Sequence, residues 1–248
     1  DGDKTASMFT GPTRPIYDLT WRFTFTGRLL WGGGSIWSHL MYGKFTELVR
    51  KRRPLAIICT HITAANVAVA VRMLTGQHFP IVCVPTDYET EGLWPHQSSN
   101  LFCVATESMA ETLRPRLVPE QRIRITGIPT REDFRASYDR KQTRQRLGLP
   151  QDKRIVLALA GAYLPRPYVH VRTALDNLLP YLHTFGDTLH FVFVAGNDAE
   201  YADHLRRACS DLGISDCVTV LEYVEGMAGL MAASDLVICK SGGLTVTE

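Results

Sequence analysis

The sequence predicts an α/β protein built from two parallel-sheet lobes. Apolar runs rich in β-branched residues alternate with segments of helical character, which is the pattern of parallel sheets covered by helices on both faces. The alternation occurs twice, and a polar, charged stretch with proline at both ends separates the two sets. We therefore expect an N-terminal lobe over residues 1–130, a linker over 131–152 and a C-terminal lobe over 153–248.

The individual elements follow from these runs. In each half of the chain, apolar runs predict strands, and some of the segments between these strands predict helices. The first predicted helix ends at Gly76, which is a typical stop signal. The predicted strands are 54–60, 80–86, 101–106, 123–126, 154–161, 189–196, 217–223 and 236–240, and the predicted helices are 64–76, 172–184, 200–212 and 226–233.

Composition and cysteine spacing exclude several classes of protein. The 248 residues carry a net charge of +2, without the basic excess that a dedicated nucleic-acid-binding protein needs, so we expect no nucleic-acid partner. The six cysteines form no CxxC pair and the histidines show no HExxH spacing, so we expect no metal and no cofactor. Cysteines inside apolar runs indicate core residues in a reducing cytosol, and no segment reads as a signal peptide or a membrane-spanning helix.

The carboxyl ends of parallel strands form the ligand-binding edge of such sheets, so the residues after each strand are the first candidates for a site. After the last predicted strand, Ser241, Gly242 and Gly243 lead into a helix, and the backbone N–H groups of such a turn can hold a diphosphate. Glu248, one helical turn further on, can accept hydrogen bonds from a ribose. The alternative is a plain turn that uses glycine for its backbone angles.

Asp87 and His61 follow two predicted strands of the first half and are candidate catalytic residues. A carboxylate or an imidazole at this edge can take the proton of an acceptor hydroxyl. The alternative for His61 is a strand-end residue that hydrogen-bonds to the backbone, whereas the position of Asp87 favours a functional role.

Several stretches resemble one group of enzymes. "LEYVEGMAGLMAASDLVICKSGGLTVTE" (221–248) is similar to the donor-binding signature of the MurG-like glycosyltransferases. "YDLTWR", "CTHITAAN", "PTDYETEGLWPH", "LFCVATE" and "GIPTREDFR" resemble, in order and spacing, the monogalactosyldiacylglycerol synthase and processive diacylglycerol glucosyltransferase branch of that family. The resemblance implies a GT-B fold, in which two Rossmann-like lobes face a cleft.

The resemblance also implies an activity and a set of site residues. The activity is an inverting, metal-independent transfer of a hexose from a UDP-sugar to diacylglycerol, in glycolipid synthesis. The implied donor-binding residues are Val224 and Met227 beside the uracil, Ser241, Gly242, Gly243, Leu244 and Thr245 at the diphosphate, and Glu248 at the ribose. Thr86, Trp94 and His96 are the implied acceptor-binding residues.

The sequence departs from the family pattern in two places. The glycine-rich loop with a histidine, expected near the start of the N-terminal lobe, is absent, and "AGAYLPRPYVHV" has only Gly161 where relatives carry a glycine-rich loop facing the donor phosphates. Arg166 can supply a charge there, although an exposed loop arginine is more often solvated. Because the family has further elements on both sides of the matched residues, we expect the chain to be a fragment that lacks both ends.

The front of the chain suggests a place of action. Residues 17–44 mix tryptophan, phenylalanine and tyrosine with basic side chains, and "RKRR" (50–53) follows. This mixture suits an anionic membrane surface, so we expect a cytoplasmic enzyme bound peripherally to the inner face of the cell membrane. The alternative is a helical layer whose aromatic side chains are core.

Two other functions stay open at this point. One is a MurG-like transferase that acts on a polyprenyl-linked or soluble acceptor, although the motifs at 17–22 and 86–96 favour diacylglycerol. The other is a non-catalytic nucleotide-binding module, suggested by the weakened loop after residue 161. The sequence does not choose between glucose, galactose and N-acetylglucosamine.

Overall fold

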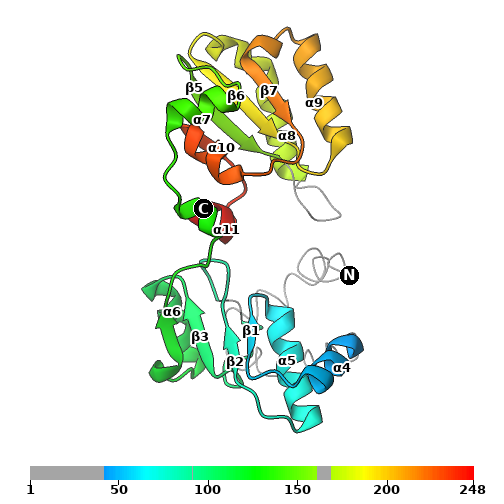
Figure 1. The fold of residues 1–248 in the computed structure, drawn as a ribbon, viewed down its shortest axis with the longest axis vertical. Coiled ribbons are helices and arrows are strands. Elements are labelled where there is room, and N and C mark those ends of the chain that lie inside the picture. Colours follow the sequence, from blue (N-terminus) through cyan, green and yellow to red (C-terminus); the bar gives the residue numbers. More distant parts are fainter. Residues whose placement is uncertain (1–41, 91, 161–168) are drawn as a thin grey trace. The chain divides into compact units, whose positions relative to one another are not determined.

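The structure is a computed structural model that describes residues 42–90, 92–160 and 169–248, and its fold is shown in Figure 1. The chain divides into two compact units, of which the first runs to Pro129 and the second begins at Thr130. Among the described residues, each unit contains one four-stranded sheet, and every neighbouring pair of strands is parallel. The predicted α/β class with two parallel-sheet lobes is therefore confirmed. The aromatic stretch 17–41 and the loop 161–168 lie outside the described residues.

In the first unit the strands follow one another across the sheet in sequence order. The order β1-β2-β3-β4 comprises β1 (Ile57–Cys59), β2 (Ile81–Cys83), β3 (Leu101–Val104) and β4 (Ile123–Ile125). The helices are α4 (Gly43–Arg52), α5 (Ile62–Thr75) and α6 (Glu107–Leu113), with short 3-10 turns at Arg114–Arg116 and Glu120–Arg122. α5 packs on β1 and β2 while α6 packs on β3 and β4.

α5 shows how local sequence sets these elements. The helix begins after His61, whose side chain accepts a hydrogen bond from the Thr63 N–H. It ends at Gly76, whose φ of 65° is the left-handed conformation that glycine adopts at low cost. The predicted helix 64–76 is confirmed, with its first turn two residues earlier.

In the second unit the strand order is β7-β6-β5-β8. The strands are β5 (Arg154–Leu159), β6 (Leu189–Val194), β7 (Val218–Leu221) and β8 (Leu236–Ile238). The helices are α7 (Arg140–Arg146), α8 (Val169–Leu178), α9 (Ala199–Asp211), α10 (Met227–Ala233) and α11 (Gly243–Thr247), with 3-10 segments at Glu132–Arg135, Leu179–Phe185 and Ser215–Cys217.

Alternate residues of the second sheet enter two separate cores, as a sheet covered on both faces requires. Val156 of β5 and Phe193 of β6 pack with the helices α8 and α9. Leu157 of β5 and Val192 of β6 pack on the other face with Leu230 of α10. This double burial explains why these strands read as continuous apolar runs in the sequence.

The polar stretch 131–152 differs from a simple linker. It contains α7, which packs against α10, and Thr143 and Arg144 of α7 are buried. The second compact unit accordingly includes this stretch. Within the described ranges, no helix combines the length and the apolar character needed to cross a bilayer.

Candidate functional site

The strand order of the second sheet marks one position for a ligand. From β5 the chain adds β6 and then β7 on one side, and it returns to add β8 on the other side. Open parallel sheets bind ligands outside the carboxyl ends of the strands at such a reversal. The segment that follows β8, at residues 239–243, therefore leaves the sheet at the point where a ligand is expected.

The turn after β8 is tight and leads directly into α11. The Gly242 N–H donates to the Lys240 carbonyl over 2.8 Å, and the Val246 N–H donates to the Gly242 carbonyl over 3.1 Å. Gly242 precedes the helix with extended angles, φ −90° and ψ 140°. Its φ is thus accessible to any residue, and the alternative stated for this turn, that glycine is needed for its backbone angles, does not apply at this position.

The nearest atoms to a Cβ at Gly242 belong to the flexible end of the Lys240 side chain, so space does not strictly require glycine there. A Cβ built there would lie 2.8 Å from Cε and 3.2 Å from Nζ of Lys240, so the lysine side chain is folded over the turn. The arrangement places the amino group of Lys240 close to the backbone of the turn at residues 241–243. Lys240 is absent from the predicted site, and its position two residues after the end of β8 is the signal that could have identified it.

The start of α10 brings a second group of predicted donor residues to the same unit. Gly226 has a φ of 77° and precedes the helix. Val224 and Met227 are partly buried against the core that Leu230 shares with the sheet. Their backbone is thereby fixed, while the neighbouring Tyr223 is 64% exposed.

Glu248 lies beside charged residues from the start of the unit. Burial raises the pKa of its carboxyl above the usual range, Arg131 acts in the opposite direction, and Asp133 adds to the increase. Arg131 is itself paired with Asp133 over 2.9 Å. The predicted ribose-binding residue is exposed, so its carboxylate is open to a ligand from solvent.

In the first unit, His61 and Asp87 leave the sheet at one edge, since Cys59 of β1 pairs with Cys83 of β2. Nδ1 of His61 accepts the Thr63 N–H over 3.2 Å, which leaves the ring proton of the neutral tautomer on Nε2. The side chain of Asp87 is exposed, and its Oδ1 accepts the Tyr88 N–H over 3.1 Å. His61 is thus bonded to the backbone, as its structural alternative describes, and Asp87 keeps a solvent-facing carboxylate.

The structure places two of the predicted acceptor residues in or against the core. Trp94 is only 5% exposed and meets the ring of Phe102 edge to face, with centroids 6.3 Å apart. His96 stacks on the same ring at 5.8 Å, and its Nε2 is 3.4 Å from Nη1 of Arg116. Burial and the Arg116 charge lower the pKa of His96 to about 3. Both side chains support the loop after β2, whereas Thr86 lies partly exposed next to Asp87.

Further contacts anchor that loop to the helices α5 and α6 of the first unit. Asn66 of α5 donates from Nδ2 to the Leu93 carbonyl over 2.9 Å, and the hydroxyls of Thr90 and Thr112 are hydrogen-bonded. Thr90 is fully buried. The loop is consequently held on the C-terminal side of Asp87. The sequence analysis did not predict this role of Asn66, whose signal is a polar residue within the otherwise apolar run 64–71.

Within residues 42–90, 92–160 and 169–248, no three His, Cys, Asp or Glu side chains come together as a metal site. The described cysteines are free thiols, and burial raises the pKa of Cys59 to about 11. Such a thiol stays protonated near neutral pH and is a poor nucleophile.

Comparison with solved structures identifies the class of fold. The chain superposes on UDP-bound MnaA of S. aureus with a TM-score of 0.58, 13% identity and coverage of 85% of this chain and 60% of that one. For UDP-GlcNAc 2-epimerase of Neisseria meningitidis the TM-score is 0.57, with 18% identity and coverage of 81% and 58%. Together with the two parallel sheets, these likenesses confirm the predicted GT-B fold.

Comparison of sequences is more specific. Residues 13–130 match the family model of monogalactosyldiacylglycerol (MGDG) synthase. The chain is 30% identical to processive diacylglycerol beta-glucosyltransferase of Bacillus subtilis over 202 residues, or 82% of this chain and 50% of that protein. Identity to the enzyme of the same name from Bacillus pumilus is 28% over 207 residues, or 83% and 51%. The chain spans about half the length of the curated relatives it matches.

These matches confirm the resemblance predicted from the sequence motifs. The chain is similar to processive diacylglycerol beta-glucosyltransferases over more than four fifths of its length, and residues 13–130 are similar to monogalactosyldiacylglycerol synthase.

Proposed function

We propose that the protein containing this chain transfers a hexose from a UDP-sugar to diacylglycerol. The observation that carries the proposal is its relation to diacylglycerol glucosyltransferases over more than four fifths of the chain. The reversal of strand order beside β8 supports it, because it marks a ligand position in the second unit. The proposed donor-binding residues are those at the start of α10 and in the turn after β8.

The reaction joins the acceptor oxygen to the anomeric carbon while the bond from that carbon to the UDP oxygen breaks. The electron pair leaves with UDP, and inversion follows from attack on the opposite side of the sugar. Lys240 and the backbone N–H groups after Gly242 are suited to offset the negative charge on the departing diphosphate, which supports a metal-independent mechanism. Ser241 and Thr245 add hydroxyl donors next to this backbone.

The acceptor proton passes to a base, and the structure favours Asp87 over His61 for this role. The lone pair of His61 Nδ1 is engaged by the Thr63 N–H, and Nε2 of that tautomer already carries a proton. Asp87 offers an exposed carboxylate at the edge of the sheet. Thr86 lies beside it and is suited to contact the acceptor, while Trp94 and His96 hold the loop from within the lobe.

The membrane surface is the proposed meeting place with the lipid. The last turn of α4 contains Arg50, Lys51 and Arg52, and Arg53 follows, all of them exposed. Leu48 and Leu55 flank them and are 51% and 96% exposed. Each basic side chain contributes about 1 kcal/mol of attraction to an anionic bilayer, so we propose peripheral attachment to the inner face of the cell membrane.

One transfer assay tests these proposals. The protein is mixed with diacylglycerol vesicles, either anionic or neutral, and with UDP-glucose, UDP-galactose or UDP-N-acetylglucosamine, with and without EDTA. We expect one donor to give glycolipid, more product on anionic vesicles, and full activity in EDTA. UDP binding without product from any donor would refute the enzyme and favour a nucleotide-binding module, and activity lost in EDTA and restored by magnesium would refute metal independence.

Substitutions within the loop test the proposed base. Asp87→Asn should lower kcat by about 10²–10⁴, the usual contribution of a general base. The matched control is Glu89→Gln, which removes an exposed carboxylate two residues away in the same loop and should leave kcat unchanged. Equal kcat values for wild type and Asp87→Asn would remove Asp87 from the mechanism.

A further inference from the structure

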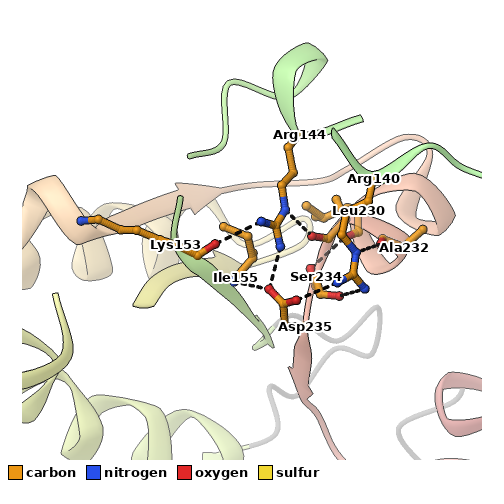
Figure 2. Close-up of polar contacts among 9 residues, drawn as sticks. Arg140, Arg144, Lys153, Ile155, Leu230, Ala232, Ser234 and Asp235 are labelled. Carbon is orange, nitrogen blue, oxygen red and sulfur yellow. Dashed lines mark hydrogen bonds and ion pairs between the residues drawn. The ribbon is translucent and has the colours of Figure 1, made fainter. Parts of the chain in front are cut away.

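An ion-pair network lies at the end of the second sheet that is remote from the proposed donor site. Asp235 immediately precedes β8, and its Oδ2 accepts from the Ile155 N–H at 2.7 Å and from Nη2 of Arg144 at 2.6 Å (Figure 2). Its Oδ1 accepts from Nη1 of Arg140 at 2.7 Å. The Asp235 N–H also donates to the Ile155 carbonyl over 2.8 Å. Backbone and side chain of one residue therefore fix the start of β8 to β5.

The two arginines come from α7 and also bind the end of α10. Arg144 donates from Nε to the Ala233 carbonyl at 2.9 Å, and Arg140 donates from Nε to the Ala232 carbonyl at 3.3 Å. Figure 2 shows both guanidinium groups converging on this corner. The last carbonyls of a helix have no partner within the helix, so the arginines of α7 supply partners that α10 lacks.

The network includes a buried charge and a close helix contact. The side chain of Arg144 is 8% exposed, and it also donates to the Lys153 carbonyl at 3.0 Å. Where α7 faces α10, a Cβ on Gly229 would lie 3.4 Å from the ring of Tyr138 and 3.7 Å from Cγ2 of Thr143. α7 is thus fitted closely to α10 as well as bonded to its end.

The position of this corner in the chain gives it a second consequence. α10 and β8 are consecutive, and only Ser234 and Asp235 connect them. The proposed uracil-binding residues, Val224 and Met227, lie at the other end of α10, and the proposed diphosphate turn lies at the other end of β8. α10 has seven residues and β8 has three, so each element extends only about 10 Å from the corner. A shift at the corner is carried to both halves of the site by short, regular elements.

We propose that Arg140, Arg144 and Asp235 are positioning residues for the donor site. They set the spacing between the residues before α10 and the turn after β8, and hence the fit of a uridine nucleotide that must contact both. The inference rests on the proposed function, because it takes those two segments as the donor-binding segments. It assigns to α7, which lies in the stretch predicted as a linker, the role of holding the two donor-binding segments in position.

The test measures two properties of the protein that contains this chain. Variants Asp235→Asn, Arg144→Lys and Arg140→Met are compared with wild type, and all are assayed at a temperature where near-ultraviolet circular dichroism shows them folded. Hydrogen exchange of residues 224–232 and 239–248 is measured without ligand. UDP affinity is measured by calorimetry, and the KM for the UDP-sugar is compared with kcat.

We expect faster exchange in both segments for each variant. UDP affinity should fall about 10-fold for Asp235→Asn, which is less than the roughly 100-fold that a 1 Å misplacement can cost a reaction. KM should rise more than kcat falls. Arg144→Lys keeps the charge but cannot make the three contacts of the guanidinium, so it should give an intermediate effect. Arg140→Met removes the more exposed arginine and keeps the test informative if Asp235→Asn does not fold.

Arg206→Met is the matched control, because Arg206 also pairs with two carboxylates in this unit, Asp203 and Glu222, but at an exposed site on α9. It should change neither exchange nor affinity. A lower melting temperature with unchanged exchange and unchanged UDP affinity would show that the network only stabilises the fold, and would overturn the inference. Absence of UDP binding by the wild type would instead contradict the proposed function, while exchange would still show whether the network orders these segments.

Discussion

Acid should destabilise the first unit through His96. The pKa of an unfolded histidine is about 6.5, whereas burial and the Arg116 charge lower the pKa of folded His96 to about 3. Between these values the unfolded chain binds more protons than the folded one, so stability falls as the pH falls. One pKa unit corresponds to about 1.4 kcal/mol, so lowering the pH from 7 to 4.5 should cost up to roughly 2–3 kcal/mol from this residue.

The variant His96→Phe isolates the effect, since it keeps an aromatic ring against Phe102 and cannot titrate. We would measure the free energy of unfolding in urea from pH 7 to pH 4.5, following hydrogen exchange of peptides around residues 94–104 so that the first unit is monitored. The stability of wild type should fall more steeply with acid than that of the variant, by the 2–3 kcal/mol estimated above. His78→Gln serves as control, because His78 is exposed in the same unit.

Parallel pH profiles for wild type and His96→Phe would refute this reasoning. They would mean that folded His96 takes up a proton as readily as an unfolded histidine, in spite of the neighbouring guanidinium at 3.4 Å.

Three further substitutions follow from the packing. Trp94→Ala removes a side chain that is 5% exposed and should lower the unfolding free energy of the first unit by about 3–5 kcal/mol in urea titrations; a loss below about 1 kcal/mol would show that the ring is not core. Asn66→Leu leaves the Leu93 carbonyl without its side-chain donor. Hydrogen exchange of residues 86–93 should therefore be faster, and the unfolding free energy of the first unit should fall by about 1–3 kcal/mol. Unchanged hydrogen exchange would contradict the anchoring role of Asn66. Gly226→Ala places a Cβ at a φ of 77° and should cost about 1–2 kcal/mol in thermal unfolding of the second unit, and equal melting temperatures would argue against the left-handed conformation.

Much of the fold is predictable from the sequence because burial on both faces leaves a simple signature. Ile155 and Val156 face opposite cores, so β5 must be apolar at successive positions. The predicted strand ends are less accurate. The run 54–60 contains β1 only at Ile57–Cys59, and Leu55 within that run is 96% exposed, since apolar character and strand pairing are separate properties.

The stretch 131–152 shows what composition does not reveal. Its polar, charged composition predicts an interdomain connection, yet Arg144 is buried because it pairs with Asp235, 91 residues further along the chain. The same limit applies to His96 and Trp94. The resemblance implies that they bind the acceptor, but a loop has no periodicity from which the direction of a side chain can be read.

The two units differ in how their candidate sites are specified, and this difference bears on how each site tolerates change. In the second unit, the turn after β8 is fixed by backbone hydrogen bonds and by neighbouring elements of a few residues, so local sequence was sufficient to find it. In the first unit, Asp87 lies on a loop whose position depends on Asn66, Thr90 and the aromatic contacts of Phe102. These contacts are tertiary, and each can be removed without altering Asp87 itself. Substitutions remote from these residues should therefore act on Asp87 through its loop, whereas they should act on the turn after β8 mainly through the corner at Asp235.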